Sequence, residues 1–371
     1  MGIFDFLKKN SSKAGKSNTI GTQKTTTQPI SISVSYSQNE IVRIEDRIKG
    51  TKPVCDGLYP HEVLVLSYAP NYYESNNDFP SFWWYKYGIK NVQLILNSLA
   101  SKGYIKQGSI ADAISLEKLT TIKAELQKYN LKASGKKPDL IARLVESVSE
   151  ESLSSVFVHR PYALTESGTQ LLKKYEWIPY IHSHGSEGLN IWNLTDMVLQ
   201  ASNHSYRDVI WGYYNHLCME YAKEGKFGLY RNCKFSMSEF VAEEKKYRHA
   251  FCYLCEVIAY DLSGLSNGFR MDFLSIYAKS YFPYERSTAT MAPAITERTK
   301  KYSEKLGWSY EDLYQHLLED IARYRLPFQL FSCQECANIV MAEIKGDRET
   351  LCQIYLDAEK RFRAQYNNFL R

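Results

Sequence analysis

The sequence predicts a mainly α fold, in which a small α+β domain in the first half of the chain precedes an all-helical domain. Three observations support this prediction. Apolar residues recur at helical spacing over much of the chain, two short strand-like segments occur at residues 104–106 and 162–164, and the pattern from Leu194 onward is helical nearly throughout. With 371 residues, of which 44% are hydrophobic, the chain is long enough for two or three domains.

Residues 1–38 are predicted to be a disordered tether. Residues 10–28 are rich in Ser, Thr, Lys, Gln and Gly and contain almost no apolar anchor, and residues 30–36 alternate weakly enough to suggest one exposed strand. The first nine residues are unlike a secretory signal, because they contain few apolar residues and an early Asp5. No stretch approaches the roughly 18 apolar residues of a membrane span. We therefore expect a cytoplasmic protein that does not enter a membrane.

Three helices followed by a strand are predicted between residues 59 and 106. The helices span residues 61–69, 79–87 and 91–102, and Gly103 is the expected stop of the third. The second strand, at residues 162–164, precedes a helix for which Thr165 is a suitable N-cap.

The second of these helices contains a run of four aromatic residues, Phe82, Trp83, Trp84 and Tyr85. Unpaired bases stack on exposed rings of this kind. Burial in the domain core is the favoured interpretation, because large rings bury enough area to anchor a small domain and only Lys86 is near in the sequence.

Residues 119–144, LTTIKAELQKYNLKASGKKPDLIARL, predict two short helices joined by a basic turn. The apolar residues that give each helix one stripe are Ile122, Leu126 and Tyr129, then Leu140, Ile141 and Leu144. Pro138 and Asp139 suit the first turn of the second helix, which places its start near Lys137. The turn combines cations, a hydroxyl and a flexible residue beside free backbone N–H groups, as anion sites do. Its residues are Lys132, Ser134, Gly135, Lys136 and Lys137.

This segment resembles the SAP family of small helix-turn-helix DNA-binding modules. The matching features are the Leu and Ile spacing, the turn at Leu131, Ser134-Gly135-Lys136-Lys137 and Leu140-Ile141-x-Arg143-Leu144. The resemblance implies that Lys136, Lys137 and Arg143 contact DNA, largely through its backbone and with little sequence preference. Some members of the family bind RNA or proteins instead.

We assign residues 111–155 to this SAP-like module. Residues 117–146 contain seven basic and four acidic residues, which gives a net charge of 7 − 4 = +3 over a small unit. Such a field attracts polyanions. An ordinary helical hairpin with a solvated charged face is the alternative.

The flanking residues, 39–110 and 156–178, resemble a winged-helix domain. The resemblance rests on a helix followed by Leu-x-x-Lys-Gly-Tyr-Ile, and on Tyr-x-Leu-Thr-x-x-Gly-x-x-Leu-Leu. It implies that the two strands form a wing with the SAP-like module inserted at its tip. It also makes residues 91–102 the recognition helix, with Lys90, Gln93, Asn97 and Lys102 directed toward a groove. The alternatives are a helix that is simply packed and a domain that docks a protein.

Residues 190–371 are predicted to form an all-helical domain that binds a protein partner. Its predicted helices span residues 205–224, 237–244, 247–262, 294–306, 310–324, 333–344 and 348–369. Ser309 and Ser332 are suitable N-caps, and residues 263–293 are the least regular stretch. The hairpin at residues 237–262 resembles one tetratricopeptide-type unit, although helix pairs of any origin show similar spacing.

Two Cys-x-x-Cys pairs, Cys252 with Cys255 and Cys333 with Cys336, could in principle bind zinc together. Both pairs lie in apolar helical contexts and are far apart in the chain, which favours buried free thiols. We therefore expect no metal site.

A search for catalytic motifs finds one match, Gly264-Leu-Ser266-Asn-Gly268, to the nucleophile elbow. An elbow follows a buried strand, whereas a helical pattern precedes this segment, so a turn after a helix explains it better. The sequence lacks the glycine-rich loops that hold nucleotide phosphates. We therefore expect no cofactor and no enzymatic activity, with a divergent nuclease as the less favoured alternative.

These patterns together predict a non-enzymatic protein that binds DNA, with RNA as the alternative nucleic acid, through the SAP-like module and a protein partner through its helical domain. The whole chain resembles SAP-domain proteins of low-GC Gram-positive bacteria and their prophages. The main alternative is a protein-interaction adaptor in which the SAP-like module is only a packing element.

Overall fold

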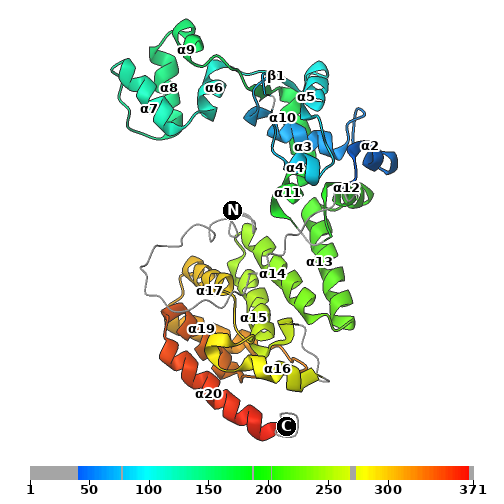
Figure 1. The fold of residues 1–371 in the computed structure, drawn as a ribbon, viewed down its shortest axis with the longest axis vertical. Coiled ribbons are helices and arrows are strands. Elements are labelled where there is room, and N and C mark those ends of the chain that lie inside the picture. The colour runs from blue at the N-terminus through cyan, green and yellow to red at the C-terminus, as the bar shows by residue number, and fades with distance from the viewer. Residues whose placement is uncertain (1–40, 77, 186–187, 202, 268–272, 367–371) are drawn as a thin grey trace, which may run out of the picture. The chain divides into compact units, whose positions relative to one another are not determined.

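The computed structural model describes residues 41–76, 78–185, 188–201, 203–267 and 273–366. The predicted tether and the predicted strand at residues 30–36 lie outside these residues. The described fold is mainly α, as predicted, and the chain divides into two units, residues 1–202 and 203–371 (Figure 1). The first unit includes helix α12 (Ile191–Gln200), whereas the sequence predicts that the helical domain begins at residue 190.

Helix α3 (Pro60–Tyr68) is the centre of the first unit. Four consecutive residues of α3, from Val63 to Leu66, are fully buried, and a helix that is apolar on all sides must be surrounded by other elements. It contacts α5, α10, α11 and α12. The helices of this part of the unit are α2 (Ile44–Arg47), α4 (Phe82–Tyr85), α5 (Val92–Ser101), α10 (Glu166–Lys174) and α11 (Trp177–His184), with 3-10 turns at Ile48–Gly50 and Ala69–Asn71.

Helix α4 is shorter than the predicted helix at residues 79–87. Pro80 lies just ahead of it, and Gly88 follows it with a φ of 71°, so the helical stretch lasts only one turn. The side chains of the aromatic run therefore differ in burial. Trp83 fills the core, as predicted, whereas Tyr85 is 62% exposed.

Strands β1 (Ile105–Gln107) and β2 (Tyr162–Leu164) pair antiparallel, with Ile105 opposite Leu164. Two backbone hydrogen bonds extend the pairing at its ends. The Gly108 N–H donates to the Pro161 carbonyl at 2.7 Å, and the Thr165 N–H donates to the Tyr104 carbonyl at 3.0 Å. The chain between the strands therefore leaves and re-enters the unit at one place.

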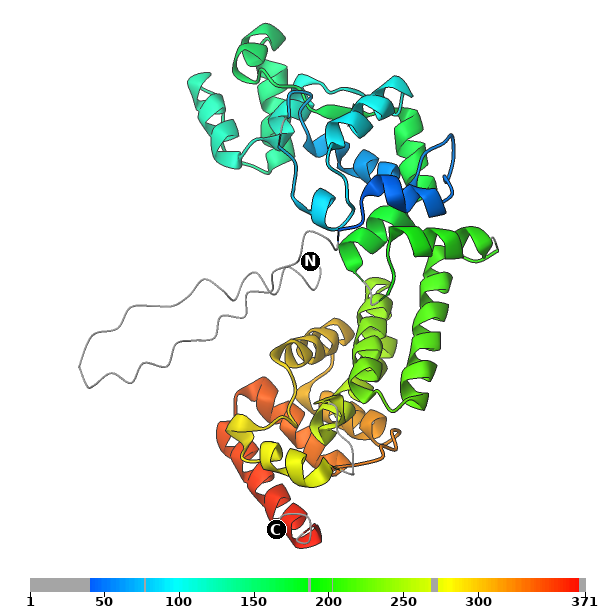
Figure 2. The ribbon, with the colours of Figure 1, turned by 45° about the vertical axis from the view of Figure 1, so that its right-hand side comes forward.

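Residues 109–160, between the strands, form a group of four helices with a core of their own (Figures 1 and 2). The helices are α6 (Ile110–Leu116), α7 (Leu119–Lys128), α8 (Lys137–Ser147) and α9 (Glu150–Val156). The buried residues of this core are Ile110, Ala113, Ile114, Ile122, Leu126, Leu140, Leu144, Val148, Leu153 and Phe157. Sequence reasoning missed α6 and α9, whose available signals were the N-caps Ser109 and Ser149.

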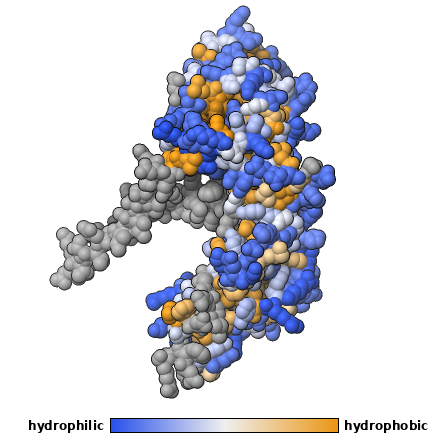
Figure 3. All heavy atoms as spheres, turned by 90° about the vertical axis from the view of Figure 1, so that its right-hand side faces the viewer, coloured by the Kyte–Doolittle hydropathy of each residue, from blue (hydrophilic) through white to orange (hydrophobic). Residues whose placement is uncertain are grey.

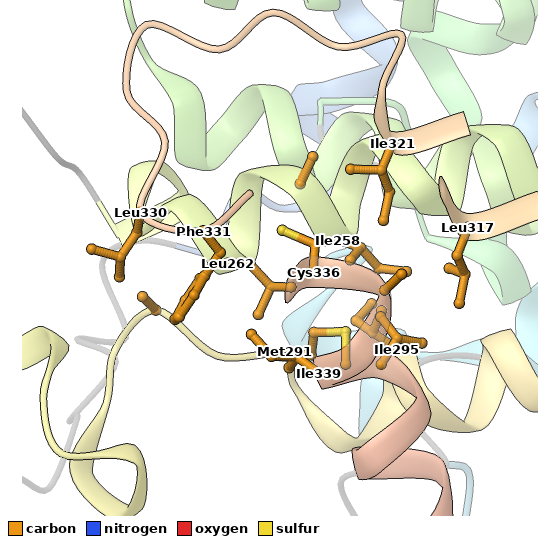
Figure 4. Packing of buried hydrophobic residues seen from close by; sticks show 14 of the residues in the cluster. Ile258, Leu262, Met291, Ile295, Leu317, Ile321, Leu330, Phe331, Cys336 and Ile339 are labelled. Atoms are coloured by element: carbon orange, nitrogen blue, oxygen red, sulfur yellow. The ribbon is translucent and has the colours of Figure 1, made fainter. Parts of the chain in front are cut away.

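The second unit surrounds helix α15, which has eleven buried residues and contacts α14, α17, α18 and α19. Figure 4 shows side chains from α15, α18, α19 and the segment before α19 converging in this core. The helices are α13 (Tyr206–Lys223), α14 (Phe227–Glu243), α15 (Tyr247–Ser263), α16 (Leu274–Tyr281), α17 (Pro293–Leu306), α18 (Tyr310–Ile321), α19 (Cys333–Lys345) and α20 (Arg348–Gln365). Short 3-10 turns lie at Leu265–Asn267 and Tyr284–Arg286. Ser309 and Ser332 cap α18 and α19, as predicted.

The prediction for helix α14 was wrong at its start, because the helix begins ten residues before residue 237. Gly228 and Asn232 are poor helix formers, so local propensity does not indicate this extension. Tertiary contacts stabilise it instead. Arg231 forms two hydrogen bonds, of 2.7 and 2.6 Å, with the buried Asp261 of α15, and Lys234 lies 3.2 Å from the buried Glu256.

The glycine of the Tyr-x-Leu-Thr-x-x-Gly motif marks a close contact between α10 and the strand pair. A Cβ added to Gly168 would lie 2.1 Å from the Tyr104 carbonyl oxygen, which is closer than any real contact. Thr165 caps α10 through the Gly168 N–H at 3.1 Å, and its own hydroxyl donates to the Gly103 carbonyl at 2.7 Å. The motif therefore fastens α10 to the base of β1.

Gly168→Ala is expected to destabilise α10 and the strand pair by about 1–3 kcal/mol or more, because the backbone must shift to make room for the added methyl group. Hydrogen exchange of the amides in α10 and β2 measures this local loss. Gly212→Ala is the matched control, since Gly212 is exposed within α13 and its added Cβ would meet nothing within 4 Å. In the Gly212→Ala control, the α13 amides should be slightly better protected, with a free energy of local opening about 0.5–1 kcal/mol higher. Equal protection of α10 in the parent and Gly168→Ala proteins would contradict the close contact.

Candidate nucleic-acid interface

Helices α7 and α8 lie where the sequence predicts them and pack against each other through a narrow apolar stripe. Ile122 and Leu126 of α7 and Leu140 and Leu144 of α8 are fully buried. Tyr129, which the sequence also places in the stripe, is 39% exposed. These four buried side chains fix the two helices and therefore the turn between them.

The backbone of the turn takes a shape that few residues other than glycine and asparagine adopt. Asn130 has a φ of 56° and Gly135 a φ of 133°, both outside the range of ordinary side-chain-bearing residues. The Leu131 N–H donates back to the Leu126 carbonyl at 2.9 Å, which closes the end of α7. The chain then approaches the start of α8 with Ser134, Gly135 and Lys136 exposed.

The first turn of α8 offers backbone donors to an anion. N–H groups in the first turn of a helix have no partner within the helix. The Lys136 N–H donates to the Asp139 carboxylate at 3.3 Å, and Pro138 has no N–H. The N–H groups of Lys137 and Asp139 remain as donors that the helix itself does not use. Together with the positive end of the helix dipole, they favour a phosphate at this point.

Two of the predicted DNA-contacting cations have their polar groups engaged within the protein. The Lys137 ammonium donates to the carbonyls of Ser115 and Glu117, each at 2.6 Å, and so satisfies the C-terminal end of α6. The Arg143 guanidinium donates to the carbonyls of Lys132 and Ser134 and thereby holds the turn against α8. Both residues position the interface, and a direct contact with DNA stays a prediction for each.

Other basic residues of the module differ in availability. Lys128 pairs with the buried Glu125 at 2.5 Å. By contrast, Lys132 and Lys136 are exposed on the turn, beside the Ser134 hydroxyl and the free donors of α8. The structure therefore brings together Lys132, Ser134, Gly135 and Lys136 as the exposed part of the predicted site.

The four predicted residues at and beside helix α5 lie in a different environment from the turn, and one of them, Lys102, donates to the Asp56 carbonyl at 3.5 Å. Gln93 is half-buried, and its amide donates to the Tyr162 hydroxyl at 2.7 Å and to the Asn97 side chain at 3.0 Å. Asn97 and Lys90 are exposed, and the Lys90 ammonium lies 5.1 Å from the centre of the Trp84 ring. The outward face of α5 also carries Leu94, which is 65% exposed.

The cysteine pairs occupy the second unit's helices, as expected for buried thiols. Cys255 of α15 and Cys336 of α19 lie in the apolar core, and burial raises the pKa of both thiols well above the usual value. Cys252 and Cys333 are half-buried. Among the described residues, no group of three or more His, Cys, Asp or Glu side chains could hold a metal ion. Ser266 lies in a 3-10 turn directly after α15, which agrees with the interpretation of a turn after a helix.

Residues 118–148 match the family model of the SAP domain, so the match covers α7, the turn and α8. No curated protein and no solved structure matches the chain. Within the described part of the chain, every helix is too short or too polar to span a membrane.

Lys137→Met is expected to destabilise the four-helix group by about 1–2 kcal/mol, because two carbonyls of α6 lose a charged donor. Lys136→Met should change stability by less than about 0.5 kcal/mol, since its side chain is exposed. Hydrogen exchange of the α6–α8 amides compares the two variants. If both variants exchanged alike, the structural role assigned to Lys137 would be wrong.

Proposed function

We propose that this protein binds nucleic acid, and DNA in particular, through the turn between α7 and α8. The observation that carries the proposal is the exposed set Lys132, Ser134, Gly135 and Lys136 beside the unused N–H donors of α8. The SAP domain match at residues 118–148 supports nucleic acid as the ligand. Contacts of this kind reach phosphates and carry little sequence information.

The rest of the first unit serves, in this proposal, as a winged-helix-like support for the module. The pairing of β1 with β2 supports it, because the two strands that flank the module are neighbours in space. Base reading by α5 receives less support, since the Gln93 amide is already hydrogen-bonded within the unit. We assign the protein a non-enzymatic role in the cytoplasm.

The second unit is proposed to bind a protein partner. Its described surface carries large apolar side chains at Met219, Ile276 and Leu356, which are 66%, 65% and 48% exposed. On the face shown in Figure 3, hydrophobic residues form several patches on a mostly hydrophilic surface. In a pull-down with the full chain, partners that stay bound after nuclease digestion would be assigned to this unit. If every partner stays bound and the chain binds no nucleic acid, the chain is an adaptor.

The double variant Lys132→Glu with Lys136→Glu should weaken binding to a blunt DNA duplex by at least about tenfold at moderate salt. It should also reduce the slope of log affinity against log salt concentration by about 2, because two phosphate contacts are lost. A salt-titrated binding assay with a fluorescent duplex measures both quantities, and an RNA duplex in the same assay compares the two nucleic acids.

The matched control for this prediction is Lys300→Glu with Lys301→Glu. These exposed, adjacent lysines of α17 change the net charge by the same amount at a distant place in the sequence. Equal losses in the two double variants would show that only net charge matters, and unchanged affinity in the Lys132 and Lys136 variant would refute the proposed interface.

A further inference from the structure

The strongest feature outside the α7–α8 turn is a surface patch made of α4 and the start of α5. It consists of Trp84, Tyr85, Lys90 and Leu94, which we call the aromatic patch. Tyr85 and Leu94 are 62% and 65% exposed, and Trp84 is half-buried. The Lys90 ammonium lies 5.1 Å from the centre of the Trp84 ring, and Tyr85 directly follows Trp84 on α4. Leu94 lies in the first turn of α5, four residues after Lys90 in the sequence.

Core packing does not explain the position of Tyr85. Its neighbour Trp83 is 1% exposed and supplies the apolar burial that this one-turn helix can provide. A soluble domain exposes single apolar side chains routinely. Here two large exposed side chains, Tyr85 and Leu94, occur with the half-buried Trp84 and the cation Lys90. Exposed apolar patches mark binding sites.

The charge of Lys90 and the composition of the surrounding sequence favour an anionic partner. Residues 79–111 contain four lysines, Lys86, Lys90, Lys102 and Lys106, and no Asp or Glu. The chain has 41 acidic residues among 371, so a stretch of this length would contain about four at the average frequency. Lys90 is the cation nearest the rings, whereas the Lys86 ammonium turns toward the His182 carbonyl at 3.5 Å.

We propose that the aromatic patch binds an unpaired nucleotide, with the base stacked on the exposed Tyr85 ring and a backbone phosphate beside Lys90. Aromatic rings interleaved with lysines are the chemistry that binds single-stranded nucleic acid, because every base presents a π-face and every nucleotide carries a phosphate. This inference deepens the proposed function by adding a second ligand form, single-stranded nucleic acid. It uses different residues from the α7–α8 turn, so either proposal can fail while the other holds.

The test compares a fluorescent ten-nucleotide oligothymidylate with an abasic strand of the same length and charge, using the full chain. Wild-type protein should bind the oligothymidylate about tenfold more tightly, because only this strand has bases to stack. Tyr85→Ala should weaken oligothymidylate binding by at least about fivefold and abasic binding by less than about twofold. Tyr85→Phe keeps the ring and should retain the preference.

Tyr310→Ala is the matched control. Tyr310 is 57% exposed with the Lys345 ammonium 5.6 Å from its ring centre, but it lies on α18 of the second unit. Its substitution should leave both affinities unchanged. Lys90→Met should weaken the binding of both strands, since it removes a phosphate contact and leaves the stacking surface in place.

Three results would overturn the proposal: no preference of the wild-type protein for the strand with bases, no binding of either strand, or equal losses of both strands in Tyr85→Ala. Capture of a protein partner that depends on Tyr85, without any preference for bases, would assign the patch to protein binding instead. The variant Lys132→Glu with Lys136→Glu separates the two proposals. It should lower the affinity for duplex while preserving the ratio between the two single strands.

Discussion

The pairing of β1 with β2 is the constraint on which the first unit depends. Residues 109–160 leave and return through this pair, and hydrogen bonds at both ends, from Gly108 to Pro161 and from Thr165 to Tyr104, extend it. A group of about 50 residues has a small core and is only marginally stable alone. Holding its two ends together lowers the entropy that its unfolded chain can gain. The strand pair therefore stabilises this four-helix group and fixes the place at which it joins the rest of the first unit.

Within the module, the basic residues divide into those that build the interface and those that remain available to a ligand. Lys137 and Arg143 donate to carbonyls of α6 and of the turn, and Lys128 pairs with the buried Glu125. A cation held by carbonyls keeps its charge, so it still contributes to the positive field that attracts a polyanion. The hydrogen bonds of such a cation, however, are made within the protein and stabilise the fold. Lys132 and Lys136 are exposed, as the proposed binding to a phosphate backbone with little sequence preference requires.

Sequence reasoning located the elements whose signals are local. The SAP motif placed α7 and α8, Pro138 and Asp139 placed the start of α8, and Ser309, Ser332 and Thr165 are the caps they were expected to be. Sequence reasoning failed for helices whose existence or bounds depend on contacts with residues far away in the sequence. The start of α14 depends on pairs with Asp261 and Glu256, and α6 and α9 are stable only through the core that they share with α7 and α8. For the same reason the engagement of Lys137 by α6 could not be predicted, since α6 itself was missed.

The aromatic run shows how one local pattern can hold two roles. Four adjacent rings on a short helix cannot all face the same core, because successive residues on a helix point about 100° apart. Trp83 is buried and Tyr85 is exposed, and residues 79–111 around them contain lysines but no Asp or Glu. Phosphate contacts weaken as salt rises, whereas stacking depends on contact between π-faces and apolar burial. If both proposals hold, a strand with exposed bases stays bound under salt conditions in which binding to a plain duplex has weakened.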